Sequence, residues 1–224
     1  MKIHWLHEWD IGIDTARRIQ QNLAHDICSE PLRQDIRTIS GADVSYSKNS
    51  NAMHAAVIVF KLPELDIVET ASASARVIFP YIPGLLSFRE APVLLQAFSK
   101  LEITPDVALF DGQGIAHPLK LGLAAHVGLF LDVPTTGCAK TRLIGEFEEP
   151  DTSKGARSAL IHHGKKIGVV LRTRQNIKPV FVSPGYKMDI EGAAEVVMRT
   201  VRGYRLPEPT RQAHLMVNRI RRMQ

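Results

Sequence analysis

The sequence predicts an α/β fold in which a three-stranded antiparallel meander is continued by parallel strands, with helices on both faces of the mixed sheet. Two observations carry this prediction. Residues 38–46, 52–61 and 65–78 are rich in β-branched and small apolar side chains and are separated only by short turns, which is typical of antiparallel neighbours. Short apolar runs then alternate with stretches of helical periodicity, which is the order of an α/β sheet.

The other elements follow from the same periodicities. Apolar spacing predicts a helix over residues 15–27, and residues 87–101 place leucines and a phenylalanine on one side of a second helix. Residues 107–110 form a continuous apolar run that ends at Asp111, a pattern typical of a strand buried on both faces. We further expect helices at 119–131, 190–202 and 207–222, a strand at 133–139, and a late hairpin formed by 166–171 and 180–183.

This order matches a ribonuclease H-like sheet, in which a meander is extended by parallel strands. Doubly wound nucleotide-binding folds fit less well, because they begin β-α-β and carry a G-x-G-x-x-G turn after the first strand. Here the first strand runs through Gly41–Tyr46 into a hairpin instead. There is no internal repeat or low-complexity linker, so we expect residues 1–224 to form one domain.

Composition indicates a soluble protein. The hydrophobic fraction is 45% and the charged fraction 23%, no stretch approaches the ~18 apolar residues of a membrane span, and the N-terminus has no secretory pattern. Cys28 and Cys138 are far apart and form no C-x-x-C pair, so we expect reduced, buried thiols in a cytoplasmic protein. The sequence shows no recognisable oligomer interface, and we expect a monomer without membrane contact.

The net charge of +5 favours a polyanionic partner. Basic residues gather in the last stretch of the chain and in a second group before it. Such runs are usually solvated faces, so charge alone leaves contact with nucleic acid open.

The segment 80–90 combines a stiff aromatic turn with a glycine. Pro80 and Pro83 each fix φ near −65°, which leaves Tyr81 and Ile82 at the tip of a rigid turn, and Gly84 then permits a close backbone approach. An aromatic residue on a stiff loop can be an anchor, a lid or a wedge between stacked bases. The alternative is an ordinary surface turn.

Three acidic residues are candidates for a metal site. Asp43 lies inside an apolar strand, where a carboxylate is costly unless it is paired or bound to metal, and Asp111 follows a buried strand at the edge where open sheets bind ligands. In a ribonuclease H-like sheet these two strands are adjacent, and the helix after Pro83 can bring Glu90. Three oxygen ligands suit Mg²⁺ or Mn²⁺ rather than zinc. For each acid alone, a satisfied turn or cap is the alternative.

Other polar residues leave two readings open. Ser87 and Glu90 have the Ser-x-x-Glu spacing of a helix capping box, with Ser87 as the N-cap. Lys140 could contact phosphate or lie on the surface, and His117 could contact a substrate or hold its loop. Nothing in the spacing of His214 alone marks it as functional.

Together, Gly41–Tyr46, Pro80–Glu90 and the run Asp-Gly-Gln-Gly-Ile-Ala-His-Pro at 111–118 resemble endonuclease V, the deoxyinosine-directed repair nuclease family. The resemblance covers roughly residues 13–222. It implies that Asp43, Glu90 and Asp111 bind metal. It also implies that Pro80–Pro83 separates the strands, with Tyr81 as the stacking residue.

The resemblance also implies a lesion pocket and two further site residues. The pocket is expected from main-chain groups around Gly84, Leu86 and Gly112, with Gly122 also lining it. The family's lysine matches Lys140 in Ala139–Arg142, and a C-terminal histidine near the metals in some members matches His214. The chain departs from many members at Leu119-Lys120, where they carry two basic residues. The acidic segment 145–151 is expected to be an exposed loop.

The activity that the resemblance implies is metal-dependent cleavage of the second phosphodiester bond 3′ of deoxyinosine, leaving a 3′-hydroxyl and a 5′-phosphate. The expected cofactor is Mg²⁺, with Mn²⁺ able to substitute, and the expected partner is damaged DNA, single- or double-stranded. The alternatives are an inosine-specific RNA nuclease, another ribonuclease H-like nuclease, and a non-catalytic lesion-binding module. A phosphotransferase is disfavoured because the chain lacks a Gly-rich phosphate loop with a lysine.

Overall fold

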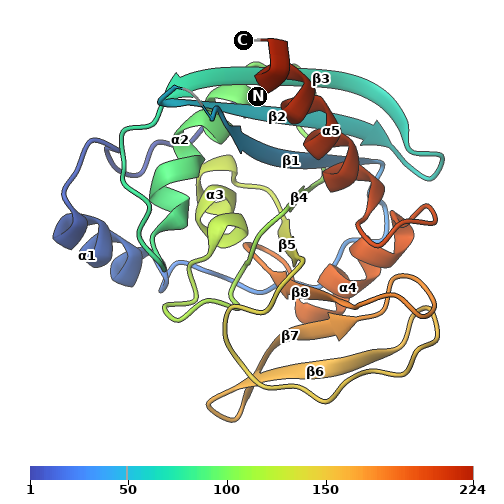
Figure 1. Ribbon diagram of the computed structural model, residues 1–224. Coiled ribbons are helices and arrows are strands. Elements are labelled where there is room, and N and C mark those ends of the chain that lie inside the picture. The colour runs from blue at the N-terminus through green and yellow to red at the C-terminus, as the bar shows by residue number, and fades with distance from the viewer. Residues whose placement is uncertain (49, 224) are drawn as a thin grey trace.

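The computed structural model describes residues 1–48 and 50–223, and its described strands form one eight-stranded mixed sheet with the order β3-β2-β1-β4-β5-β8-β7-β6 (Figure 1). The strands are β1 (Thr38–Tyr46), β2 (Ala52–Lys61), β3 (Asp66–Arg76), β4 (Val107–Phe110), β5 (Thr135–Ala139), β6 (Arg157–His162), β7 (Lys165–Leu171) and β8 (Val180–Pro184). The helices are α1 (Ile13–Leu23), α2 (Leu86–Phe98), α3 (Leu123–Leu131), α4 (Ile190–Arg199) and α5 (Glu208–Met223).

The predicted meander and its parallel extension are confirmed. β1 and β2 are antiparallel, as are β2 and β3, whereas β4 runs parallel to β1 and β5 runs parallel to β4. In the β1–β4 register, Ala42 lies opposite Phe110. The next residue on each strand is an aspartate, so the pairing itself brings Asp43 beside Asp111.

The far half of the sheet is antiparallel and larger than predicted. β8 pairs with β5, β7 pairs with β8 as the predicted hairpin requires, and β6 adds an outer strand that the sequence did not reveal. β6 lies at the edge of the sheet, where only Leu160 is fully buried. A half-exposed edge strand needs no strong apolar alternation, and this explains why its pattern is weak.

Helices cover both faces of the sheet, as expected. Ala108 and Phe110 of β4 belong to a core beneath α2 and α3, whereas Val107 and Leu109 belong to a second core with α4. Neighbouring residues of a strand face opposite sides of the sheet, so the short apolar strand β4 supplies both cores. α5 crosses the same face as α4, over β1 and β2 (Figure 1).

The capping-box prediction at the start of α2 is wrong. Among the described residues no side chain caps this helix, its N-cap is Leu85, and Ser87 lies inside the first turn. The Ser87 hydroxyl instead lies 2.9 Å from Nδ1 of the buried His126 on α3. Ser87 therefore ties α2 to α3, and Glu90 is free for another role.

The remaining differences are small. α3 begins at Leu123 rather than residue 119, because Lys120 adopts a positive φ of 54° and Gly122 is the extended N-cap. Within the described chain both cysteines are free, but Cys28 is partly exposed, so only Cys138 is buried as expected. None of the helices in the described part of the chain has the length and apolar character needed to cross a membrane.

Candidate active site

Asp43 and Asp111 form the centre of the site. Their side chains are only 12% and 13% exposed, and they extend from adjacent parallel strands at the same edge of the sheet. Burial, and next the charge of Asp111, raise the pKa of Asp43 above its usual range, while a hydrogen bond from His214 opposes that rise. Two partly buried carboxylates this close repel each other, so the arrangement favours a cation or a proton between them.

Gly41 allows α5 to bring His214 to these acids. A Cβ at Gly41 would lie 2.1 Å from backbone atoms of Pro209 in the first turn of α5, so a residue with a side chain would push the helix off β1. His214 Nδ1 lies 2.7 Å from Oδ2 of Asp43, and Asn218 Nδ2 lies 3.1 Å from the other ring nitrogen. Because the Asn218 amide donates to Nε2, Nδ1 carries the proton and donates to Asp43.

Asp43 and Asp111, two of the three expected metal ligands, lie in one cluster with His214. Asp43, Asp111 and His214 each offer one ligand atom, and these atoms all lie within 4.8 Å of one another. Glu90 stands beside this cluster, and its Oε1 accepts a 2.8 Å hydrogen bond from the Tyr46 hydroxyl. Burial, together with the charges of Asp43 and Asp111, raises the pKa of Glu90 to about 7.

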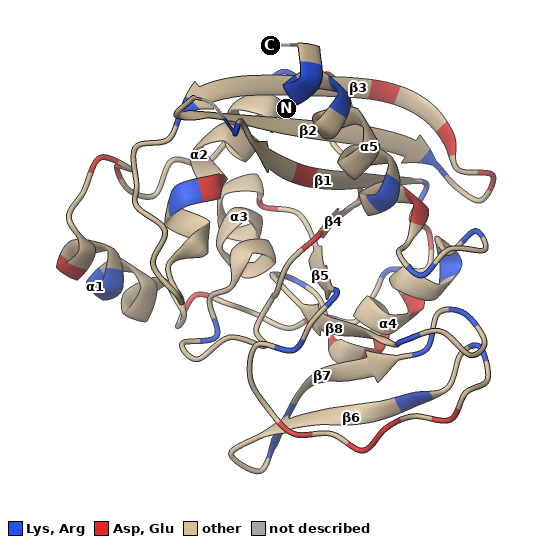
Figure 2. Cartoon of the chain, viewed as in Figure 1, with Lys and Arg blue, Asp and Glu red and all other residues tan. Residues whose placement is uncertain are grey.

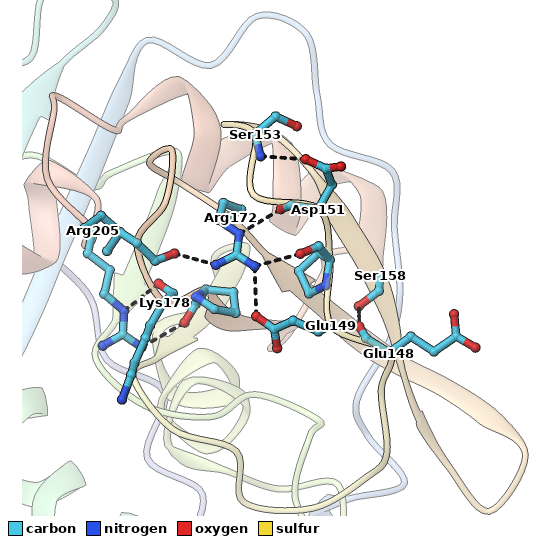
Figure 3. Close-up of polar contacts among 11 residues, drawn as sticks. Glu148, Glu149, Asp151, Ser153, Ser158, Arg172, Lys178 and Arg205 are labelled. Atoms are coloured by element: carbon cyan, nitrogen blue, oxygen red, sulfur yellow. Dashed lines mark hydrogen bonds and ion pairs between the residues drawn. The ribbon is translucent and has the colours of Figure 1, made fainter.

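Lys140 lies at the end of β5 and pairs with Asp111. Its main chain is held by Arg205, whose guanidinium donates to the carbonyl of Lys140 at 2.6 Å. The same guanidinium donates to the carbonyls of Pro179 (2.8 Å) and Lys178 (3.0 Å) (Figure 3). Arg205 was not singled out from the sequence as a site residue, because an arginine that binds carbonyls looks like any other member of a basic run.

The acidic segment 145–151 is an exposed loop, as predicted, and it stands away from the acids of the site. The buried Arg172 fixes it by donating to the carbonyls of Pro150 (2.7 Å) and Asp151 (2.8 Å) and to the carboxylate of Glu149 (2.8 Å) (Figure 3). The acidic segment runs beside β6, at the opposite end of the molecule from the basic C-terminal end of α5 (Figure 2). The negative charge of this segment is thus kept away from the C-terminal end of α5.

The turn of residues 80–85 presents an exposed aromatic ring. Tyr81 is 68% exposed at its tip, and the Leu85 N–H donates to the Ile82 carbonyl at 2.9 Å. Gly84 has a φ of 83°, which a residue with a side chain rarely adopts. The rigid turn that the sequence predicted is present, and its aromatic tip points to solvent.

A pocket of about 140 Å³ opens beside this turn. It is lined by Gly84, Leu86 and Gly122, which were predicted for the lesion pocket, and by Tyr81, Ile82 and Pro83 of the predicted wedge. The other lining residues are His117, Ser87, Gln113, Leu121, Leu123 and Leu143. Pro80, Gly112 and Lys140 are not among its lining residues. Gln113 and Leu143 were missed, although Gln113 stands in the motif at 111–118 and Leu143 is an isolated apolar residue in an exposed loop.

His117 holds its loop. The ring is buried, Nδ1 accepts from the Leu119 N–H at 3.2 Å, and burial lowers the pKa to about 4 against a hydrogen bond to the Gly84 backbone. A histidine with this pKa is neutral at physiological pH, so it offers an uncharged wall to the pocket and no charge to a phosphate.

The mixed sheet and its paired aspartates define the class of protein, an α/β protein of ribonuclease H-like fold with a nuclease-type acidic site. Residues 21–215 match the family model described as Endonuclease V. The chain therefore belongs to the Endonuclease V family of nucleases, as the motifs of the sequence indicated.

Relatives and solved structures agree. The chain is 46% identical over 216 residues to Endonuclease V of Methanothrix thermoacetophila. The aligned residues cover 96% of this chain and 95% of that protein. The crystal structure of Endonuclease V from Bacillus subtilis superposes with a TM-score of 0.95 at 33% identity, covering 100% of this chain and 98% of that one. A third structure, Ciona intestinalis Endonuclease V in complex with a DNA containing an inosine followed by a ribo-adenosine, has a TM-score of 0.84 at 26% identity and covers 95% of this chain and 99% of that one.

Proposed function

We propose that this chain is a metal-dependent endonuclease that recognises deoxyinosine in DNA and hydrolyses the second phosphodiester bond 3′ of the lesion, leaving a 3′-hydroxyl and a 5′-phosphate. The observation that carries the proposal is the combination of a carboxylate cluster with an exposed tyrosine on a rigid turn beside a small pocket. The inosine-containing DNA bound by the Ciona relative supports the choice of substrate.

The residues of the cluster fit a divalent cation. Asp43 and Asp111 offer carboxylate oxygens, and oxygen ligands of this kind suit Mg²⁺, with Mn²⁺ able to substitute. Glu90 adds a third carboxylate whose raised pKa shows that the site disfavours negative charge as it stands. When bound, the cation supplies Lewis-acid stabilisation of the charge that develops on the phosphate.

Lys140 and His214 have supporting roles in this proposal. Lys140 is anchored by Arg205 and reaches Asp111, so its ammonium group is placed where a phosphate of the substrate would meet the acids. His214 donates from Nδ1 to Asp43 and so holds that carboxylate in one orientation. Both residues position charge around the reacting phosphate.

The pocket suits the O6 atom of hypoxanthine. α2 begins at Leu86 and α3 at Leu123, and both residues line the pocket. The first N–H groups of a helix have no carbonyl partner within that helix and carry a partial positive charge. Such donors favour the O6 acceptor of hypoxanthine and disfavour the amino group that adenine carries at the same position.

Tyr81 would stabilise the opened duplex. A base that leaves the stack costs a few kcal/mol, and stacking of an aromatic side chain on the neighbouring bases returns about 1–3 kcal/mol. Tyr81 is exposed on a turn fixed by two prolines, so it loses little conformational freedom when it inserts.

The test is cleavage of a labelled duplex that carries a single deoxyinosine, in Mg²⁺ and in EDTA, beside an undamaged duplex and an inosine-containing RNA. We expect a nick that requires Mg²⁺ and is absent from the undamaged duplex. Asp111→Asn should lose the nick, whereas Asp10→Asn, at an exposed aspartate, should keep it. Cutting of the RNA alone would move the substrate to RNA, and lesion binding without any cutting would leave a binding module.

A further inference from the structure

Gln20 on α1 is a buried polar residue that the proposed function does not use. Its side chain is only 2% exposed, whereas the neighbouring Gln21 is exposed to solvent. A buried amide needs partners, and the Gln20 Nε2 finds two main-chain carbonyls, those of Gly84 at 2.8 Å and of Leu121 at 3.3 Å. Because both acceptors are carbonyl oxygens, the amide must present its NH₂ group to them.

The two carbonyls belong to the two chain segments that form the pocket. Gly84 precedes Leu85, the N-cap of α2, and Leu121 precedes Gly122, the N-cap of α3. Gly84 and Leu121 are 37 positions apart in the sequence, yet one amide group joins them, and both residues line the pocket. Gln20 therefore fixes the relative position of the two helix starts from behind.

The turn at Gly84 depends on such a fixed partner. Gly84 has a positive φ of 83°, and a glycine without external contacts samples many conformations. In the same helix, Ala16 lies one helical turn before Gln20 and packs with Leu85 and Phe88. α1 thus presents an apolar contact and a hydrogen-bonding amide to the base of the turn that carries Tyr81.

We propose that Gln20 is a positioning residue for lesion recognition, which sets the spacing between the Gly84–Leu86 backbone and the Leu121–Leu123 backbone and thereby the discrimination between deoxyinosine and normal bases. The proposal rests on the proposed function, since it assumes that the pocket reads the lesion. It assigns Gln20 no contact with the reacting phosphate, because its amide is committed to the two carbonyls.

The experiment compares Gln20→Met with Gln21→Met, which apply the same change to adjacent residues of one helix. Methionine keeps the length and helix propensity of glutamine but donates no hydrogen bond. Binding of a fluorescent single-deoxyinosine oligonucleotide and of its undamaged counterpart is measured in EDTA, where no cleavage occurs, and thermal unfolding is measured for each variant.

We expect Gln20→Met to lose roughly tenfold in affinity for the deoxyinosine oligonucleotide, about 1.4 kcal/mol, while its affinity for undamaged DNA stays within about twofold of the parent. Gln21→Met should bind both as the parent does. If Gln20→Met does not fold, Gln20→Asn keeps the amide on a side chain that is one methylene shorter, so it should not bridge both carbonyls and should show the same selective loss.

Two results would contradict this expectation, and they can be told apart. A parent chain that binds the two oligonucleotides equally would overturn the proposed function and this inference with it. A discriminating parent with a folded Gln20→Met or Gln20→Asn variant that discriminates equally well, or that loses the same factor on both oligonucleotides, would overturn the role of Gln20 alone.

Discussion

The buried His117 should make the fold sensitive to acid in a way that one substitution removes. Burial lowers the pKa of His117 from 6.5 to about 4, so in the folded protein the ring stays neutral to well below neutral pH, whereas in the unfolded chain it takes up a proton near pH 6.5. Since the folded pKa is the lower one, the associated stability is present above pH 6.5 and is lost as pH falls from there to about 4.

The magnitude follows from the two pKa values. At pH 4.5 the linkage penalty of a histidine shifted from 6.5 to about 4 is about 2–3 kcal/mol, and at pH 7 it is less than about 1 kcal/mol. The parent should therefore lose about 2 kcal/mol more than His117→Gln between pH 7 and pH 4.5. His126 is present in both proteins, and burial, the largest cause of its lowered pKa, acts on it in both; only the smaller contribution of the His117 charge to that lowering is removed with His117.

The assay is urea denaturation of the parent, His117→Gln and the exposed-site control His25→Gln at pH 7 and pH 4.5. Glutamine can still donate from its amide toward Gly84, so the comparison removes titration with little change in shape. His25→Gln should follow the parent at both pH values. Equal losses of stability in the parent and in His117→Gln would refute the reasoning that His117 is held neutral by burial.

Four further predictions concern the site. Asp111→Asn should abolish cleavage in Mg²⁺ while lesion binding survives; cutting at the parent rate would contradict the metal assignment. Tyr81→Ala should weaken the discrimination between deoxyinosine and normal DNA in a binding assay, and an equal loss on both would point to unfolding instead. Gly41→Ala should destabilise the fold by about 1–3 kcal/mol in urea, because the new Cβ meets the Pro209 backbone at 2.1 Å, and should slow cleavage by displacing α5; unchanged stability would refute the close approach. Arg205→Gln should slow cleavage and destabilise the protein by about 1–3 kcal/mol, whereas Arg174→Gln at an exposed position should do neither.

Strand order made the centre of the site predictable. A meander followed by a buried parallel strand fixes which strands are adjacent, so Asp43 and Asp111 had to meet. The turn between Pro80 and Pro83 is stiff because each proline fixes its own φ, so this property could be predicted directly from the sequence.

The membership of the cluster depended on how helices pack. His214 joins the acids because Gly41 lets α5 rest on β1, and no local pattern reveals a contact between residues so far apart in the chain. Ser87 matched a capping box but was recruited by the buried His126, which shows tertiary structure overriding a local motif. The edge strand β6 was missed because half-exposed strands carry little apolar signal.

The burial of Gln20 could have been predicted from its position in the helix. A glutamine within a polar amphipathic helix looks like a surface residue, yet Gln20 follows Ala16 by four positions, and these are the buried residues of α1. A polar residue on the apolar face of a helix is worth examining for a main-chain partner.

The cleavage proposed for this chain is best tested by the position and chemistry of the cut in a duplex with one deoxyinosine, labelled at the 5′ end of the damaged strand. We predict, in Mg²⁺ and not in EDTA, a single product that ends at the second phosphodiester bond 3′ of the lesion, still contains the hypoxanthine base and has a 3′-hydroxyl that a DNA polymerase can extend. A free base, a cut at the lesion itself, or the same product in EDTA would contradict it.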